Sequence, residues 1–256
     1  MLKKERQQKI ADAVRSKKSV TVQELALNLY VSEATIRRDL IELEKSGVLS
    51  RSHGGAFLPQ GGAVESPGMI REKQNVHKKR IIAGLVCDFL RPETTVFIDS
   101  SSSAGAVIPY LTAAGAVSVI TNGIRNCLKL TQQGAAKVYI CPGTVSGYSD
   151  AALGTDAVDY ISGFYADLCI ISCGGISTTC GVTEASRDQA HIKQKMLENS
   201  ATRLLLCDSS KFGRDCMSIV CGFDKFDYIL TDSMPNKDIV QDVKNAGCEI
   251  ICPGIN

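Results

Sequence analysis

The 256-residue sequence lacks any apolar run of about 18 residues, the length that a membrane-spanning helix needs. It also lacks the apolar leader of a secretory signal, because its first residues, MLKKERQQKI, pass directly from charge into a helical pattern. We therefore expect a cytoplasmic protein that has no membrane partner.

The sequence also lacks the ligand spacing of a metal site. It has 11 cysteines but no CxxC motif, and it has 3 histidines. Two cysteine pairs lie four residues apart in apolar runs: Cys169 with Cys173, and Cys248 with Cys252. On one face of a strand such thiols behave as small hydrophobic side chains. A zinc site is the alternative, but the scattered histidines favour no metal and no cofactor.

Positive charge is concentrated near the N-terminus. Residues 1–53 carry 11 Lys and Arg against 7 Asp and Glu, whereas the remaining residues carry 18 against 20. A basic segment on a slightly acidic body favours a polyanion as the partner of that segment. The alternative is an ordinary solvated surface.

The basic segment has the pattern of a helix-turn-helix. Residues 5–17 have helical composition, and Thr21 then starts a capping box with Glu24, which predicts the start of a short helix. Ser32 is an N-cap for the next helix, and Gly47 is placed to end that helix. Two short helices joined by a tight turn form the helix-turn-helix arrangement.

The helix that follows Ser32 has one apolar face and one basic face. Its apolar stripe, which we expect to face the core, consists of Ile36, Leu40 and Leu43. Arg38 points away from this stripe, with Arg37 and Thr35 on the two flanks. Arginine can bridge a guanine edge or hold a phosphate, and Ser32 and Thr35 can donate to phosphate oxygens. The alternative is a solvated helix whose arginines pair with the neighbouring Asp39 and Glu42.

Residues 48–57, VLSRSHGGAF, are typical of a strand, a Gly-Gly turn and a second strand, which together predict a wing. Arg51 and His53 lie on one face of the first strand, where they can reach the DNA backbone or the minor groove. His53 is alternatively an exposed turn residue. The predicted DNA-binding residues are therefore Thr21, Ser32, Thr35, Arg37, Arg38, Arg51 and His53.

The rest of the sequence predicts an α/β domain with a mostly parallel sheet covered by helices. The predicted strands are TVFID, VSVIT, KVYIC, DLCIIS, RLLLCD, DYILTD and EIIC. Short, nearly continuous apolar runs of this kind are typical of strands that are covered on both faces. We predict a winged helix-turn-helix domain at residues 3–58, a Gly- and Pro-rich linker at residues 59–70 and the α/β domain at residues 71–256. The basic residues Lys78, Lys79 and Arg80 are expected to cover a helix surface, and the alternative is that they extend the DNA-binding surface.

Polar or backbone-exposing residues follow nearly every predicted strand. They are Asp99-Ser100, Thr121-Asn122-Gly123, Pro142-Gly143, Cys173-Gly174-Gly175, Asp208-Ser209-Ser210-Lys211 and Thr231-Asp232-Ser233. Each of them can be a simple turn or helix cap. Their recurrence favours a small polar ligand, because open α/β sheets bind ligands outside the carboxyl ends of their strands.

The loop after the first strand suggests the chemistry of that ligand. The hydroxyls of Ser100 to Ser103, with the free N–H groups of a helix predicted from Ala104, suit a phosphate. Asp99 would repel a phosphate and suits sugar hydroxyls instead. Lys211 is the favoured balancing cation, although it can also be a plain surface lysine. The other candidate cations are Arg187 and Lys193.

The run TVQELALNLYVSEATIRRDLIELEKSGVLSRSHGGA resembles the DNA-binding domain of DeoR-family transcriptional regulators, through SEATIRRDL, the following LE pair and HGG. In that family the helix beginning near Ser32 is the recognition helix. The body is similar to the family's effector domain in FIDSSSS, VITNG, CGG, GVTEAS followed by IKQKM, and CDSSKFG. The resemblance implies a fold similar to ribose-5-phosphate isomerase and coenzyme A transferases, and a phosphorylated sugar as effector. The predicted effector-binding residues are Asp99, Ser100, Ser101, Ser102, Ser103, Thr121, Asn122, Gly143, Gly174, Gly175, Thr183, Glu184, Lys193, Asp208 and Lys211.

Two departures from the family pattern affect this predicted pocket. The segment Ser101-Ser102-Ser103 stands where the family usually has a Gly-Thr-Thr type sequence, and Pro142-Gly143 stands where it usually has Gly-Gly. The first departure keeps the phosphate donors but removes a glycine that allows close approach of the backbone.

A sugar-phosphate isomerase with an added DNA-binding domain is the alternative function. Isomerases of the related fold carry a lysine just before a run of glycines, where this chain has Cys173, and no lysine occurs between Lys137 and Lys193. Glu184 and Asp167 are possible bases, but neither has an evident acid partner. We therefore expect no enzyme activity.

We expect a transcriptional regulator, most readily a repressor of a carbohydrate-catabolic operon, that binds double-stranded operator DNA as a dimer or larger homo-oligomer. A phosphorylated sugar or polyol is expected to control it.

Overall fold

The computed structural model describes residues 2–17, 19–45, 48–52, 54–57, 68–115, 118–135, 137–146 and 149–254. The predicted helix end at Gly47, the wing residue His53 and most of the predicted linker lie outside these ranges. Within the described residues, no helix combines the length and the apolar character that crossing a membrane requires.

The N-terminal elements are α1 (Lys3–Lys17), β1 (Ser19–Thr21), α2 (Val22–Leu29), α3 (Glu33–Lys45), β2 (Ser50–Ser52) and β3 (Gly55–Phe57). The later strands are β4 (Thr95–Ile98), β5 (Ser118–Thr121), β6 (Lys137–Ile140), β7 (Thr144–Ser146), β8 (Ala151–Leu153), β9 (Ala166–Ser172), β10 (Gly175–Ser177), β11 (Gly181–Glu184), β12 (Ser200–Leu206), β13 (Ser218–Cys221), β14 (Tyr228–Leu230) and β15 (Glu249–Ile251). The later helices are α4 (Gly68–Lys73), α5 (Val76–Leu85), α6 (Ser102–Gly105), α7 (Ile108–Ala113), α8 (Ile124–Gln132), α9 (Thr155–Ser162), α10 (Arg187–Glu198) and α11 (Lys237–Asn245). The short 3-10 helices are η1 (Val86–Phe89), η2 (Ser209–Lys211) and η3 (Phe223–Lys225).

Helices α1, α2 and α3 pack around a small core of their own. The predicted apolar stripe of α3, Ile36, Leu40 and Leu43, is buried there together with Ile10 and Val14 of α1. The prediction of the core-facing side of α3 is therefore confirmed, and the opposite side of the helix carries the arginines.

Both predicted N-caps are present. The hydroxyl of Thr21 accepts a hydrogen bond from the N–H of Glu24 at 3.1 Å, and the hydroxyl of Ser32 accepts one from the N–H of Thr35 at 3.3 Å. A hydrogen bond from Lys17 and, more weakly, the N–H of Thr21 lower the pKa of the Glu24 carboxyl. These caps fix the first turn of α2 and the first turn of α3.

The wing is present as an antiparallel sheet. Within the described residues, its strands have the order β1-β3-β2. The predicted strands β2 and β3 pair with each other, and β1 pairs with the other side of β3. Gly55 permits this approach, because a Cβ at that position would lie 2.2 Å from the carbonyl oxygen of Val20. Strand β1 was not predicted, since a three-residue strand between two helices has no periodicity to detect.

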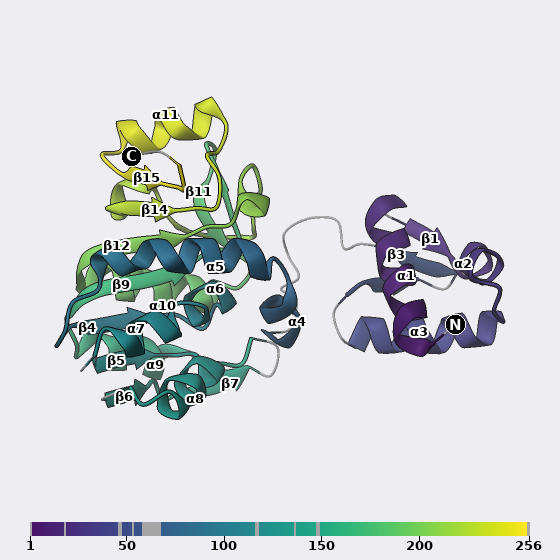
Figure 1. Cartoon of the computed structure of the whole chain (residues 1–256), viewed down its shortest axis with the longest axis horizontal. Helices are drawn as coiled ribbons and strands as arrows, with labels where there is room; N and C mark the ends of the chain where they lie inside the picture. The colour runs from purple at the N-terminus through teal and green to yellow at the C-terminus, as the bar shows by residue number, and fades with distance from the viewer. Residues whose placement is uncertain are drawn as a thin grey trace.

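The main sheet contains every strand that the sequence predicts for the body (Figure 1). Among the described residues, it has seven strands in the order β15-β14-β12-β9-β4-β5-β6. All of its neighbouring strands pair in parallel. The carboxyl ends of β4, β5, β9 and β12 therefore lie side by side at one edge of the sheet, as the prediction of a strand-end site requires.

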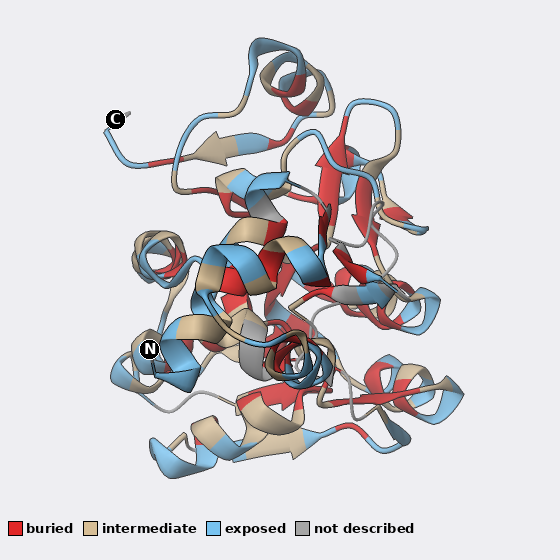
Figure 2. Cartoon of the chain, turned by 90° about the vertical axis from the view of Figure 1, so that its right-hand side faces the viewer, coloured by how far each residue is buried: buried red, intermediate tan, exposed pale blue. Residues whose placement is uncertain are grey.

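Both faces of this sheet are buried (Figure 2). One face packs against α9, α10 and α11, and the other packs against α5, α6, α7 and α8. Alternate residues of β4 belong to opposite cores, Phe97 to the first and Val96 and Ile98 to the second. This double coverage explains why the strands are nearly continuous in apolar residues. Cys169 in β9 and Cys173 directly after it are free cysteines buried in the apolar core, as predicted.

Two small antiparallel sheets were not predicted. Strands β7 and β8 form a hairpin, and β10, β11 and β13 form a sheet whose order is β10-β11-β13. Their three- and four-residue lengths leave little pattern in the sequence. They affect the site directly, because β11 ends at Glu184 beside the carboxyl edge of the main sheet.

The turn between α2 and α3 permits a test of local strain. Tyr30 has a left-handed backbone, with φ of 54°, and is 94% exposed. Tyr30→Gly and Tyr30→Ala remove the same ring, but only alanine keeps a Cβ, whose strain in this region costs about 1 kcal/mol. In hydrogen exchange of the full chain, we expect the amides of α2 and α3 to have an opening free energy about 1 kcal/mol higher in the glycine variant than in the alanine variant. Equal protection in the two variants would contradict this account.

Candidate functional site

The predicted recognition face of α3 is exposed. Arg38 is exposed and forms no ion pair or hydrogen bond with any residue that the structure describes. Arg37 is also exposed, and its guanidinium lies 3.0 Å from the carboxylate of Glu33, one helical turn away. The hydroxyls of Ser32 and Thr35 lie 2.9 Å apart at the start of the helix. The structure thus groups these four predicted residues at one end of α3.

Asp39 and Glu42, two further acids of α3, pair with α1 and not with the arginines of this face. Asp39 is buried and pairs with Arg6 of α1 at 2.5 Å, and Glu42 pairs with Lys3 at 2.7 Å. The alternative interpretation, in which these two acids pair with Arg37 and Arg38, is therefore wrong. Helix α1 supplies their partners because it packs across α3, which the sequence pattern did not reveal.

The wing residue Arg51 is held by α3. The guanidinium of Arg51 lies 3.1 Å from the carboxylate of Glu44, and the backbone N–H of Arg51 donates to the same carboxylate at 2.9 Å. Thr21 serves as the N-cap of α2. These contacts position both residues, while their predicted DNA contacts stay predictions.

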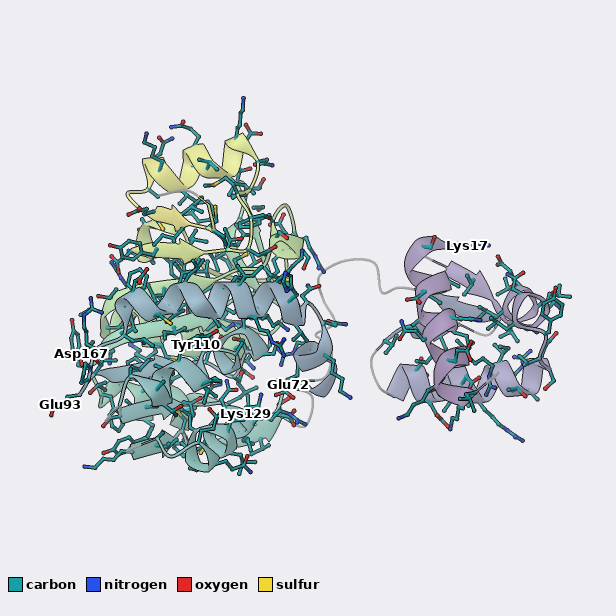
Figure 3. All side chains as sticks on the ribbon, in the orientation of Figure 1. Lys17, Glu72, Glu93, Tyr110, Lys129 and Asp167 are labelled. Atoms are coloured by element: carbon teal, nitrogen blue, oxygen red, sulfur yellow. The ribbon has the colours of Figure 1, made fainter. Side chains whose placement is uncertain are left out.

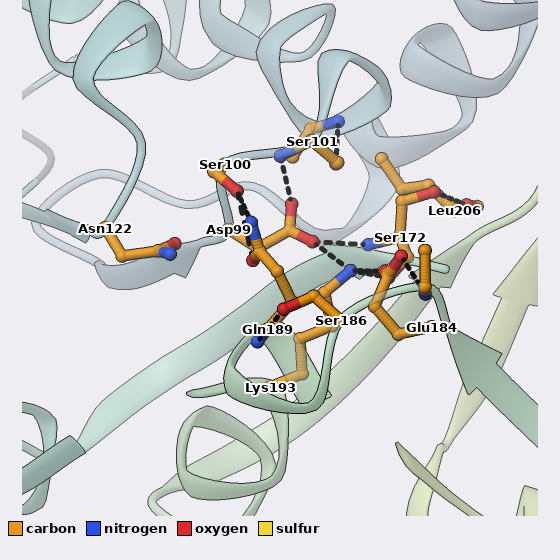
Figure 4. A network of polar contacts seen from close by, with 12 residues as sticks. Asp99, Ser100, Ser101, Asn122, Ser172, Glu184, Ser186, Gln189, Lys193 and Leu206 are labelled. Atoms are coloured by element: carbon orange, nitrogen blue, oxygen red, sulfur yellow. Dashed lines mark hydrogen bonds and ion pairs between the residues drawn. The ribbon is translucent and has the colours of Figure 1, made fainter. Parts of the chain in front are cut away.

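At the carboxyl edge of the main sheet, the structure places a buried lysine between two carboxylates. The ammonium of Lys193 lies 2.9 Å from Asp99 and 2.5 Å from Glu184 (Figure 4). It also donates to the carbonyl oxygen of Ser172 at 2.6 Å. Lys193 is 2% exposed. We call Asp99, Lys193 and Glu184 the buried triad.

The carboxylate oxygens of the triad also accept hydrogen bonds from backbone N–H groups. Asp99 accepts hydrogen bonds from the N–H groups of Ser101 and Ser172 at 3.0 and 3.2 Å, and Glu184 accepts one from the N–H of Ala185 at 2.9 Å. Burial opposes ionisation of Asp99, but Lys193 and these donors hold its pKa below the ordinary value. Burial likewise opposes the charge of Lys193, but the two carboxylates raise its pKa. The triad is therefore a closed structural network of charge pairs and hydrogen bonds.

This finding changes the roles expected for two residues. Lys193 is neutralised by two carboxylates, so it does not offer a free charge to an anion. Glu184 has both oxygens engaged, so it is not a free general base of the kind an isomerase needs. The other possible base, Asp167, accepts from the N–H of Thr95 at the start of β4, at the opposite end of the sheet.

The serine loop after β4 divides into buried and accessible hydroxyls. Ser101 is the N-cap of α6 and accepts from the N–H of Ala104 at 3.1 Å, and Ser103 is buried. Ser100 and Ser102 are half-buried. The predicted helix start at Ala104 is wrong, because α6 begins at Ser102, and the cap occupies the N–H of Ala104.

Neutral amides surround Ser100. Its hydroxyl lies 3.1 Å from the amide nitrogen of Gln189, a residue that was not predicted (Figure 4). Gln189 precedes Lys193 by one turn of α10, and that spacing was a usable signal. The amide of Asn122 is buried; it donates to the carbonyl of Ala152 at 3.3 Å, and its oxygen has no partner among the described residues. Thr121 accepts from the N–H of Gly123 at 3.0 Å, which shapes the loop after β5.

Lys211 reaches the same edge from the loop after β12. Its ammonium donates to the hydroxyl of Ser172 at 2.8 Å, and Ser172 also contacts Asp99 and Lys193. Lys211 is half-buried. The carboxylate of Asp208 accepts from the N–H of Ser210 and is held in its own loop. The prediction that the loops after β4, β9 and β12 converge is confirmed.

The predicted glycines have structural roles. A Cβ on Gly143 would lie 2.4 Å from the carbonyl oxygen of Leu153, and one on Gly175 would lie 2.3 Å from that of Arg214. Gly174 lies beside the triad, where a Cβ would be 3.1 Å from Glu184. The hydroxyl of Thr183 is occupied by the carbonyl of Gly175 and the N–H of Cys216. Their predicted contacts with an effector stay predictions. The other candidate cation, Arg187, is exposed at the start of α10.

Lys78 and Lys79 of α5 were expected on an exposed helix surface, but both contact other parts of the domain. Lys79 is buried, and its ammonium donates to the carbonyl oxygens of Arg71 and Gln74. Burial and then the charge of Lys211 lower the pKa of Lys79 to about 8. Lys78 contacts the hydroxyl of Ser209 at 2.5 Å. The start of α5 therefore packs against the loop that carries Lys211, instead of covering an exposed surface.

Two cavities lie away from this edge. One, of about 360 Å³, lies between α9 and α10, and another, of about 470 Å³, lies at the amino ends of the strands near Glu93. Their linings contain none of the predicted effector-binding residues. We favour the strand-end cluster, because its polar side chains converge and include a half-buried cation. No group of three or more His, Cys, Asp or Glu side chains within the described residues is arranged to hold a metal ion.

The sequence matches two family models. Residues 6–60 match the DeoR-like helix-turn-helix domain, and residues 74–233 match the DeoR C terminal sensor domain. The HTH-type transcriptional regulator GlpR of Haloferax volcanii is 29% identical over 251 residues, which cover 98% of both chains. The HTH-type transcriptional regulator YulB of Bacillus subtilis is 32% identical over 91% of this chain and 90% of its own. The glycerol-3-phosphate regulon repressor of Escherichia coli is 29% identical over 94% of this chain and 95% of its own.

Solved structures give a weaker likeness. Ribose 5-phosphate isomerase from Plasmodium falciparum has a TM-score of 0.39 at 15% identity, over 53% of this chain and 52% of that chain. Translation initiation factor eIF-2B from Pyrococcus horikoshii has a TM-score of 0.43 at 12% identity, over 83% of this chain and 69% of that chain. Likenesses of this size carry no argument about the chain.

The buried triad predicts a large loss of stability on removal of its cation. Lys193→Met keeps a long side chain but leaves two buried carboxylates facing each other, which costs about 3–5 kcal/mol. The matched control is Lys195→Met on the same helix, where the lysine pairs with the exposed Glu198 at 2.5 Å and contributes about 0–1 kcal/mol. Urea unfolding of the full chain measures both changes. Equal midpoints for the two variants would show that the triad does not hold the edge together.

Proposed function

The chain belongs to the DeoR family of transcriptional regulators, and from this premise we propose that it represses a carbohydrate-catabolic operon under the control of a phosphorylated sugar or polyol. A helix-turn-helix at one end and a sensor domain behind it supply the two activities that such control requires. The name of one relative, the glycerol-3-phosphate regulon repressor, supports a small phosphorylated polyol as the class of effector.

The observation that carries the proposal is the half-buried Lys211 beside the neutralised triad. Because two carboxylates already balance Lys193, Lys211 is the cation of this cluster that can turn toward a phosphate. The hydroxyls of Ser100 and Ser102 are accessible donors on the neighbouring strand end. A phosphate is best bound by such a combination of a cation and neutral donors.

The other end of the effector would face neutral groups. The unpaired oxygen of Asn122 is a buried acceptor, and a buried acceptor without a partner costs about 1–3 kcal/mol. A hydrogen bond donated by a sugar hydroxyl to the side-chain oxygen of Asn122 would remove that cost. The amide of Gln189 and the hydroxyl of Ser100 can exchange their mutual hydrogen bond for bonds to the same sugar.

Operator binding would use α3 in the major groove, with its exposed Arg37 and Arg38 toward the bases and phosphates. We propose a dimer or larger homo-oligomer, because two such helices can read half-sites separated by whole turns of the duplex. The effector changes DNA binding only if its affinity differs between the two conformations of the regulator.

The effector class is tested by thermal unfolding of the full chain with glycerol 3-phosphate, fructose 1-phosphate, glucose 6-phosphate and ribose 5-phosphate. A compound at 100 times its dissociation constant adds about 2.7 kcal/mol of stability, which corresponds to roughly 5–10 °C at this size. Lys211→Met should abolish the shift. Lys225→Met is the control, because Lys225 is exposed and pairs with the exposed Asp224. A shift that survives in Lys211→Met would refute the assigned cation, and conversion of a compound into product would refute a regulator without enzyme activity.

The recognition face is tested with Arg38→Ala and a duplex selected from a random library by the full chain. Loss of a guanidinium that contacts a base or phosphate should weaken binding by about 1–3 kcal/mol, or roughly 5- to 150-fold. Lys9→Ala is the control, because Lys9 is an exposed residue of α1 that pairs with Glu5 at 3.3 Å. Fluorescence anisotropy at fixed salt measures both affinities. Unchanged affinity in Arg38→Ala would place the recognition surface elsewhere.

A further inference from the structure

We propose that residues 68–79, which comprise α4 and the start of α5, transmit the state of the strand-end site to the DNA-binding domain. We call this segment the elbow. The inference rests on the proposed function, since it concerns how an effector at that site changes DNA binding. It is carried by the contacts of the elbow with three separate loops of the site.

The first contact joins the elbow to the loop and helix that follow β5. The carboxylate of Glu72 lies 2.5 Å from the ammonium of Lys129 and 4.0 Å from the guanidinium of Arg125, both in α8 (Figure 3). Gly68 lies against the ion pair of Arg125 with Asp150, where a Cβ would be 2.6 Å from the carboxylate of Asp150. Helix α8 starts two residues after Asn122, so a shift of the loop after β5 would displace both ends of α4.

The second contact joins the elbow to the loop that carries Lys211. Asn75 has a left-handed backbone, with φ of 51°, and its amide donates to Asp208 at 3.1 Å and to Ser210 at 3.0 Å. The next turn adds the contact of Lys78 with Ser209. Movement of Lys211 toward a phosphate would therefore pull on residues 75–78.

The third contact is the packing of α4 and α5 against α6. Helix α6 starts at Ser102, within the serine loop after β4. The elbow thus touches the loop after β12, which carries Lys211, and the helices that directly follow the loops after β4 and β5, which carry the accessible serines and Asn122. A ligand that draws these loops together changes the surface on which the elbow rests.

Lys79 gives the elbow a response to charge. Its ammonium ties the end of α4 to α5 through the carbonyl oxygens of Arg71 and Gln74. Burial, followed by repulsion from Lys211, lowers the pKa of Lys79 to about 8, while Asp208 and Glu72 act in the opposite direction and Arg71 adds further repulsion. An anion bound at Lys211 offsets that repulsion and favours the charged form, which strengthens the tie.

The elbow is also the part of the sensor domain that is nearest in sequence to the wing. Residues 58–67 alone separate Phe57, the end of β3, from Gly68. The elbow therefore borders, in the sequence, the segment that leads to the DNA-binding domain.

The first test needs no effector. Asn75→Gly keeps the left-handed backbone without strain and removes the amide, and Glu72→Gln removes the ion pairs with α8. Hydrogen exchange of the full chain should rise severalfold in the elbow and also in residues 208–211 for Asn75→Gly, and in the elbow and residues 124–129 for Glu72→Gln. Glu93→Gln is the control, because Glu93 is exposed at the far side of the sheet (Figure 3). Changes confined to the substituted residue would overturn the inference.

The second test measures coupling. In the wild-type chain, a sugar phosphate from the thermal panel should change the affinity for the selected duplex by about 5- to 150-fold. In Asn75→Gly and Glu72→Gln, basal DNA affinity and the thermal shift should be kept, while the change in affinity falls below about twofold. A full response in both variants would overturn the inference. If no panel compound binds the wild-type chain, the proposed function fails, while the exchange experiment still decides whether the elbow is coupled to the site loops.

Discussion

The carboxyl edge of the sheet depends on one buried cation. Lys193 stands between Asp99 and Glu184, so the loop after β4, the end of β11 and helix α10 are joined by charge. Such a network is stable only when every oxygen has a donor, because an uncompensated buried charge costs several kcal/mol. Here the N–H groups of Ser101, Ser172 and Ala185 complete it. The edge is therefore a fixed frame, and ligand chemistry is left to the half-buried groups around it.

The elements that were predicted correctly are those whose buried side chains form a clear apolar pattern in the sequence. All strands of the main sheet were found because both of their faces are covered, and the core stripe of α3 was found because its spacing is helical. The strands β7, β10 and β13 are too short to carry a pattern. Strands β10 and β13 pair with β11 and so set the position of Glu184, which no local signal could give.

The convergence of the strand ends was predicted, and the structural roles of their residues were predicted only in part. The strand ends converge as expected for an open α/β sheet, so Asp99, Ser100, Asn122 and Lys211 were correctly brought together. The role of Lys193 was not predictable, because its two partners lie in other elements and a sequence shows a lysine without its neighbours. The same limit applies to Lys79, whose helix gave a basic start typical of an exposed surface.

The magnitudes of these interactions decide which part of the domain can move. Disturbing the triad would expose or separate buried charges, at about 3–5 kcal/mol, which exceeds the roughly 2.7 kcal/mol that an effector at 100 times its dissociation constant supplies. The elbow is held by pairs such as Glu72 with Lys129, whose side chains are 29% and 37% exposed, and pairs of that kind are worth about 0–1 kcal/mol each. A small anion therefore cannot reorganise the frame, but it has enough binding energy to shift the elbow. Coupling requires only a difference in affinity between two arrangements of the elbow. In the proposed mechanism, a rigid frame and a weakly held segment beside it are therefore sufficient for control of DNA binding.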